Sequence, residues 1–205
     1  VGLTENDVAA AVHAAQILAG SEYTGLPIFV NNGTRSRMTH ATWYREQLEP
    51  GQTVFFEIPG CIHRYHAAIV RPVFLGDPPP LMLKTAETVL EALKTAKSHI
   101  KPGVKPGDVY EAVQRTLMEG LGIRKENRTG YSMGIAFPPD WGEGHILSFH
   151  KGEQRPLQAG MTFHLVNGVR VPGLGHKVSC TDTILVTEDG CETLTDRLER
   201  KLYAR

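Results

Sequence analysis

The feature of this sequence that most constrains its fold is an internal repeat. Residues 7–12 and 108–113 share the pattern Asp-Val, two variable residues, Ala-Val, and each stretch opens a segment with helical periodicity. Residues 51–55 and 160–164 both begin with glycine and run into β-prone residues. The two pairs are offset by about the same amount, as a duplicated helix-then-strand unit requires. Short matches of this kind also arise by chance, but the shared order of elements favours duplication.

Local patterns predict where the helices and strands lie. Thr4 followed by Asp7 predicts a helix N-cap. An apolar stripe from Met82 to Ile100 predicts a long amphipathic helix behind a run of three prolines. Asp108 is expected to cap a further helix that continues to Leu117. We expect strands within residues 27–30, 53–58, 65–75, 161–166 and 178–186.

The composition excludes several classes of protein. The 205 residues are 41% apolar, which is enough for one large domain or two halves that share one core. Lys plus Arg and Asp plus Glu number 22 each, so no net charge attracts nucleic acid or an anionic membrane. The sequence has no long apolar run and no signal-peptide pattern. The three cysteines, Cys61, Cys180 and Cys191, predict packed thiols in a reducing cytoplasm.

Several motifs resemble the catalytic domain of the creatinase, prolidase and aminopeptidase P family. Residues 51–60 resemble the family's G-D-x-V-x-x-D-x-G, and residues 71–74 its T-R-T-F. Residues 160–168 resemble G-M-x-F-T-I-E-P-G, and residues 181–190 resemble E-D-T-V-L-V-T-E-D-G. The resemblance implies an α+β pita-bread domain over residues 1–205. In that fold an internally duplicated, curved antiparallel sheet carries helices on its outer face and the site on its inner face.

The resemblance also implies a pair of metal ions, and most of the ligands for them are missing. The family's two Asp, one His and two Glu fall on Glu57, Ala68, Tyr131, Val166 and Thr181. Two divalent cations held close together need several carboxylate oxygens to offset their charge. One carboxylate in five positions does not supply them. We therefore expect no metal and no other cofactor, and we do not expect the standard di-metal peptidase.

Family members that dispense with metal, creatinase and the ectoine hydrolases, cleave C–N bonds in small amidine or guanidine compounds. This sequence is more similar to the ectoine hydrolases than to creatinase. The segments that carry this similarity are 56–57, 60–61, 64–66, 130–134, 138–143 and 163–165. The resemblance therefore implies a metal-independent hydrolase.

Glu57 and His40 are the expected catalytic residues. Glu57 follows three apolar residues in a strand, where burial would raise the pKa of its carboxyl and suit it to acid/base work or nucleophilic attack. The alternative is a surface glutamate on a strand edge. The resemblance places His40 where creatinase-like members keep a histidine that shuttles protons. Otherwise, a lone histidine in a loop is usually a surface residue.

Two further histidines are expected to contact substrate. His66 and His164 each lie two residues before a lost ligand position, and because strand side chains alternate between faces, both should point inward. Together with Glu57 and His40 they could form a mononuclear metal site, but no HxxxH or HExxH spacing supports one. Buried histidines in hydrogen bonds near the substrate are the favoured interpretation.

Aromatic and charged residues complete the expected substrate pocket. Tyr131 and Trp141 would form an aromatic wall around a cationic or amidinium group, or else belong to the core. Glu143 and Arg71 would pair with substrate charges, or else form structural salt bridges.

Three hypotheses about function remain open. The leading one is a metal-independent hydrolase that cleaves a C–N bond of a small zwitterionic compound such as a cyclic amidine. The second is an Xaa-Pro dipeptidase or aminopeptidase with an atypical metal site. The third is a small-molecule-binding homologue that has lost its chemistry, although a pure binder would not need Glu57 and His40.

The expected partners follow from the same resemblance. It implies a small-molecule substrate, a homodimer and a smaller N-terminal domain that helps to close the pocket. The sequence opens at Val1 without an initiator methionine, so we expect a fragment without that domain. We expect a cytoplasmic protein with no nucleic-acid or membrane partner.

Overall fold

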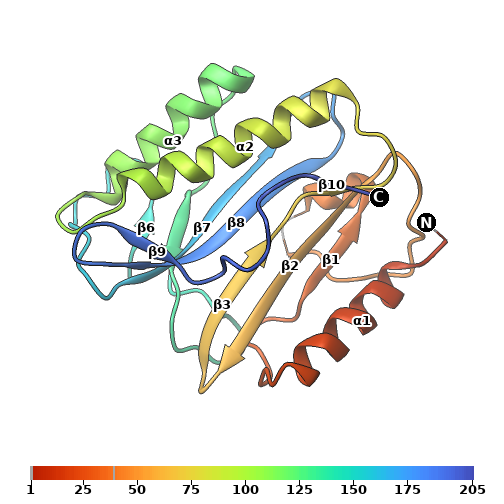
Figure 1. Ribbon diagram of the computed structural model, residues 1–205, viewed down its shortest axis with the longest axis horizontal. Helices are drawn as coiled ribbons and strands as arrows, with labels where there is room; N and C mark the ends of the chain where they lie inside the picture. Colours follow the sequence, from red (N-terminus) through yellow and green to blue (C-terminus); the bar gives the residue numbers. More distant parts are fainter. Residues whose placement is uncertain (1, 39) are drawn as a thin grey trace.

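The computed structural model describes residues 2–38 and 40–205. Its central feature is a large sheet in which the strands follow the order β10-β4-β2-β3-β8-β7-β5-β6, with β1 paired to β2 and β9 to β8 (Figure 1). The pairing of β10 with β4 is parallel, and the other named pairings are antiparallel. The strands are β1 (Phe29–Asn32), β2 (Thr53–Ile62), β3 (Tyr65–Val70), β4 (Val73–Phe74), β5 (Gly130–Ser132), β6 (Ser148–Phe149), β7 (Thr162–Arg170), β8 (Lys177–Val186), β9 (Cys191–Thr193) and β10 (Tyr203–Ala204).

Within the described residues, three α-helices pack on one face of this sheet. They are α1 (Glu5–Leu18), α2 (Pro80–His99) and α3 (Pro106–Leu121), and a short 3₁₀ helix, η1 (Gly33–Arg37), follows β1. Figure 1 shows α2 and α3 over β7 and β8, and α1 beside β1. The apolar core between α2, α3 and the sheet includes Leu165 and Cys180. Phe56 packs with residues of α1.

The helix boundaries follow from local sequence. Thr4 and Asp7 form a capping box, which confirms the predicted start of α1. The apolar stripe predicted from Met82 is buried in α2, which begins at Pro80. The prediction that Asp108 caps the next helix is wrong. Proline is pre-organised for the first helical position, so α3 begins at Pro106 and Asp108 lies inside its first turn.

The strand order confirms the predicted duplication. Strands β1, β2 and β3 pair in that order, and β5, β7 and β8 do the same in the second half. The two sets meet where β3 pairs with β8, at Val70 and Thr181. Helix α1 precedes the first set and α3 the second. The repeated units therefore lie side by side in one sheet and join where β3 pairs with β8.

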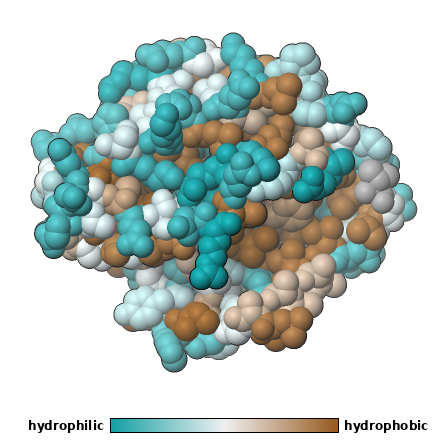
Figure 2. All heavy atoms as spheres, viewed as in Figure 1, coloured by the Kyte–Doolittle hydropathy of each residue, from teal (hydrophilic) through white to brown (hydrophobic). Residues whose placement is uncertain are grey.

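The helices leave part of their face of the sheet open. Figure 2, which shows this side of the molecule, has hydrophobic residues gathered beside α1 where the first-half strands lie. On β2 and β3 the half-buried residues that point to this face include Phe56, Ile58 and Ile69. Within residues 2–38 and 40–205, none of the helices combines the length and the apolar character needed to span a bilayer.

The cysteines are packing residues, as predicted. Cys61 and Cys180 are buried, Cys191 is half-buried, and all three are free thiols. Cys180 and Cys191 pack in or against the main core.

Candidate active site

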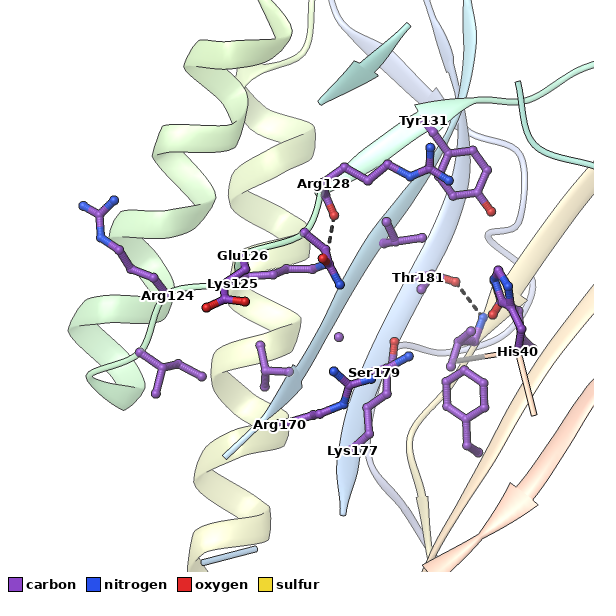
Figure 3. A pocket seen from close by; sticks show the side chains of 18 residues that line it. His40, Arg124, Lys125, Glu126, Arg128, Tyr131, Arg170, Lys177, Ser179 and Thr181 are labelled. Atoms are coloured by element: carbon purple, nitrogen blue, oxygen red, sulfur yellow. Dashed lines mark hydrogen bonds between the residues drawn. The ribbon is translucent and has the colours of Figure 1, made fainter. Parts of the chain in front are cut away.

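A cavity of about 620 Å³ opens on the face of the sheet that the helices do not cover. Strand register puts Glu57, Val70, Thr181 and Val166 in one row across β2, β3, β8 and β7, and all four line the cavity. The loop of residues 123–128, which follows α3, forms a wall (Figure 3). The predicted site on the face opposite the helices therefore coincides with a cavity.

Glu57 is the buried carboxylate of this cavity. It lies in the middle of β2, where the alternation of side chains turns it away from the helices, and its exposed fraction is 5%. Burial raises the pKa of Glu57 to about 7, and the charge of Lys177 opposes that rise. The inward orientation agrees with the expectation from the sequence, and the catalytic role of Glu57 stays a prediction.

His40 lines the same cavity from the segment that follows η1. Its backbone φ is 64°, a left-handed conformation that is uncommon outside glycine, and its ring stacks on Phe29 at a centroid distance of 4.7 Å. Burial lowers the pKa of His40, and the negative charge of Asp140 opposes this effect. Because its imidazole is neutral near pH 7, His40 can accept a proton from a molecule in the cavity.

A chain of polar contacts runs behind Glu57. Nδ1 of His164 lies 3.9 Å from Oε1 of Glu57 and 3.3 Å from the Tyr131 hydroxyl oxygen. That hydroxyl accepts a hydrogen bond of 3.1 Å from Nε1 of Trp141. Tyr131 borders the cavity, whereas the lining does not include His164 or Trp141. The three side chains thus support one wall of the site, and only Tyr131 is placed to touch a ligand in it.

Burial and charge also shift the pKa values along this chain. Burial lowers the pKa of His164 to about 3, so its imidazole is neutral throughout the physiological range. Burial, with a contribution from the charge of Glu57, raises the pKa of Tyr131 above its ordinary value. Neither residue therefore brings a formal charge next to Glu57.

Two further residues expected in the pocket do not line this cavity. His66 points inward from β3 as predicted, but its Nε2 accepts a hydrogen bond of 2.9 Å from the Gly25 backbone and it does not line the cavity. Glu143 lines a different cavity, together with Met133 and Arg155.

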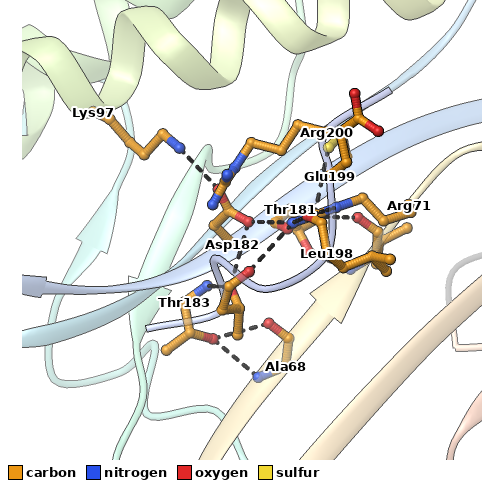
Figure 4. A network of polar contacts seen from close by, with 12 residues as sticks. Ala68, Arg71, Lys97, Thr181, Asp182, Thr183, Leu198, Glu199 and Arg200 are labelled. Atoms are coloured by element: carbon orange, nitrogen blue, oxygen red, sulfur yellow. Dashed lines mark hydrogen bonds and ion pairs between the residues drawn. The ribbon is translucent and has the colours of Figure 1, made fainter. Parts of the chain in front are cut away.

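Arg71 lies apart from the cavity, in a network around Asp182 (Figure 4). Its guanidinium donates to the Asp182 carboxylate at 2.8 Å and to the Thr181 carbonyl at 2.6 Å. Asp182 is fully buried and also pairs with Lys97 and Arg200. Burial acts to raise the pKa of Asp182, but hydrogen bonds from Arg200 and Lys97 outweigh it and leave the pKa lowered. This arrangement matches the structural salt bridge that was the alternative interpretation of Arg71.

Sequence reasoning missed the cationic residues of the cavity. Lys125 and Arg128 come from the loop after α3, and Arg170 and Lys177 from the paired ends of β7 and β8. Strand alternation could have found Lys177, because it shares a face with Thr181 on β8. The loop residues carried no comparable signal.

The residues at the family's ligand positions do not fit a metal pair. Ala68 and Val166 offer no donor atom. The hydroxyl of Thr181 accepts a hydrogen bond of 2.8 Å from the Val70 backbone, and that of Tyr131 is held by Trp141. Within the described parts of the chain, no group of three or more His, Cys, Asp or Glu is arranged to hold a metal ion. Glu57 alone cannot balance the charge of two divalent cations.

Comparisons with known proteins agree with this fold. The model of metallopeptidase family M24 matches residues 1–188. An ectoine hydrolase of Halomonas elongata is 34% identical over 91% of this chain and 46% of that protein. An Xaa-Pro dipeptidase of Pyrococcus furiosus is 28% identical over 98% of this chain and 56% of that protein. The chain spans about half the length of the curated relatives it matches.

Solved structures support the same assignment. The prolidase from Pyrococcus furiosus superposes with a TM-score of 0.86 at 26% identity, over 97% of this chain and 57% of that one. The dipeptidase PepE from Mycobacterium ulcerans gives the same TM-score at 25% identity, over 100% of this chain and 54% of that one. The resemblance inferred from the sequence motifs and the predicted pita-bread fold are both confirmed. The chain belongs to metallopeptidase family M24, a family of hydrolases that act on C–N bonds.

Proposed function

We propose that this protein is a metal-independent hydrolase that cleaves a C–N bond in a small zwitterionic amidine-type compound, as an ectoine hydrolase does. The observation that carries the proposal is the single buried carboxylate, Glu57, in a cavity whose other family ligand positions are occupied by residues unsuited to a metal pair. The 34% sequence identity with the ectoine hydrolase of Halomonas elongata supports the choice of substrate class.

Glu57 is assigned the attack on the amidine carbon. Its carboxylate oxygen forms a bond to the carbon of the protonated amidine, and the π electrons of the C=N bond move to nitrogen, so that both nitrogens of the adduct are uncharged. The C–N bond to the other nitrogen then breaks, and that nitrogen leaves as an amine after it takes a proton. Water attacks the same carbon, the bond to Glu57 breaks, and an amide and a free carboxylate remain. The sum is one amidine plus one water giving one amide and one amine.

His40 is assigned the proton transfers in this sequence. Its lowered pKa keeps the imidazole neutral before reaction, so it can take a proton from the nitrogen that stays on the carbon and pass it to the nitrogen that leaves. Later it can take a proton from the attacking water and return it to the remaining nitrogen. His40 and Glu57 line the same cavity, as this division of roles requires. Tyr131 borders the cavity, and its fixed ring shapes the space that the substrate occupies.

Ring opening of ectoine, measured by chromatography, tests this proposal. The wild-type protein should form the ring-opened amide, and Glu57→Gln should bind ectoine without turning it over. His40→Asn retains a residue that tolerates the left-handed backbone and should lower kcat by about 10²- to 10⁴-fold. Glu143→Gln is the matched control, because Glu143 lines a different cavity, and it should keep wild-type activity.

The same assay separates the competing functions. Cleavage of Xaa-Pro dipeptides that depends on added divalent cations would establish the peptidase hypothesis instead. Ligand binding without turnover by the wild-type protein would establish the non-catalytic homologue. The homodimer, the N-terminal domain and the cytoplasmic location stay predictions.

A further inference from the structure

Cationic side chains outnumber carboxylates in the lining of the cavity, which includes Glu57 and Glu126. Lys125 and Arg128 lie in the loop after α3, and Arg170 and Lys177 are register partners on β7 and β8. Figure 3 shows the side chains of Lys125, Arg170 and Lys177 extending into the same space. Acidic and basic residues balance over the whole chain, so this concentration of cations is a local feature of the site.

Lys177 and Glu57 line the same cavity. Its Nζ lies 4.4 Å from the ring centroid of Phe55, and its charge acts on the Glu57 carboxyl. Among the residues that the structure describes, its ammonium has no hydrogen bond to a protein acceptor. Lys177 thus presents up to three N–H donors toward the cavity.

Lys125 presents further donors from the loop after α3. Its Nζ donates to the Arg128 carbonyl at 2.8 Å, which leaves two of its three ammonium protons for another acceptor. Burial, together with the charges of Lys177, Arg128 and Arg170, lowers the pKa of Lys125 to about 7. The cations therefore repel one another across the cavity, and a bound anion would relieve that repulsion.

We propose that Lys125 and Lys177, with added charge from Arg128 and Arg170, form an anion subsite that holds a carboxylate of the substrate. This inference rests on the proposed function and narrows its substrates to small carboxylic acids whose C–N bond faces Glu57. A monoanion fits better than a phosphate, because a dianion beside Glu57 would disfavour the ionised form of its carboxyl.

Binding to the Glu57→Gln protein tests the subsite without any need for turnover. The probes are ectoine, which carries a carboxylate, and its carboxamide, which is matched in shape and lacks the negative charge. Titration calorimetry should show ectoine binding about 10- to 100-fold more tightly. Introducing Lys177→Met or Lys125→Met should remove most of that difference and leave carboxamide binding unchanged. Methionine preserves much of the apolar stem that packs on Phe55.

A matched control and the remaining outcomes make the test decisive. Lys94→Met removes an exposed lysine of α2 and should leave both affinities unchanged. Equal affinities for the two probes would overturn the subsite, whatever the turnover result. Carboxylate-dependent binding without turnover by the wild-type protein would support the subsite and reject the proposed function. If inorganic phosphate displaced ectoine at lower concentration than acetate did, the assignment to a carboxylate would be overturned.

Discussion

Oε1 of Glu57 lies 3.9 Å from Nδ1 of His164, yet the two groups do not form a charged pair. Burial raises the pKa of Glu57 to about 7 and lowers that of His164 to about 3, so no imidazolium is available near neutral pH. Lys177 is therefore the cation that favours ionisation of Glu57. In this arrangement ionisation of the Glu57 carboxyl is unfavourable, and the carboxylate that forms is expected to be a stronger nucleophile than a solvated one.

The rate of hydrolysis should follow ionisation of Glu57. Because the proposed attacking form is the carboxylate, kcat/KM should rise about tenfold per pH unit below pH 6 and level off above pH 8, with a midpoint near 7. Lys177→Met removes the charge that opposes the rise in pKa, so its midpoint should move to higher pH. A wild-type midpoint near 4.5 would contradict a buried nucleophile.

Glu57 should cost stability at alkaline pH. At pH well below 4.5 the carboxyl is protonated in both the folded and unfolded states, so its ionisation has no effect on stability. As pH rises from 4.5 to 7, only the unfolded state ionises, and wild-type stability should fall by about 3 kcal/mol. In urea unfolding, the free energy of unfolding of Glu57→Gln should therefore increase relative to that of the wild type as the pH rises from 4.5 to 7. The exposed Glu126 provides the control. If Glu126→Gln gained as much stability relative to the wild type, the effect would not come from burial of the carboxyl.

The Tyr131 hydroxyl should contribute measurably to folding. Tyr131→Phe leaves the buried Trp141 N–H without its acceptor and His164 Nδ1 without its partner, which should lower the free energy of unfolding by about 1–3 kcal/mol. Tyr65→Phe, at a residue that is 61% exposed, is the comparison and should change little. Equal effects of the two substitutions in urea unfolding would argue against the polar chain behind Glu57.

Much of the fold could be predicted from sequence because the relevant signals are local or repeated. The capping box at Thr4, the stripe from Met82 and the duplicated strand openings all appear as short patterns, and each corresponds to an observed element. Glu57 was found for the same reason, since a carboxylate within an apolar strand is conspicuous.

The rest of the site depends on contacts between distant segments. Lys125 and Lys177 line the same cavity only because the folded chain places the loop after α3 near the first residue of β8. No local sequence pattern indicates that these two segments lie close together. The face of the sheet to which Arg71 points could have been predicted from the sequence. It directly follows Val70, whose side chain lines the cavity, so strand alternation would have turned Arg71 toward the helix side.

The network around Asp182 should hold the fold together and have no part in chemistry. Asp182→Asn leaves Arg71, Lys97 and Arg200 without their shared counter-charge, and should lower the free energy of unfolding by about 3–5 kcal/mol. Asp196→Asn, at an exposed position, should have little effect. A loss below 1 kcal/mol for Asp182→Asn would show that the buried charges find other partners.

The central claim is that Glu57 performs the reaction without a metal ion. The most direct measurement is the turnover of ectoine by protein whose metal content has been brought below stoichiometric levels and verified by elemental analysis, with and without added Mn²⁺, Co²⁺ or Zn²⁺. We predict that stripped protein retains wild-type kcat, that added cations do not raise it, and that Glu57→Gln abolishes it. Loss of activity on stripping, with recovery on adding a divalent cation, would contradict the claim.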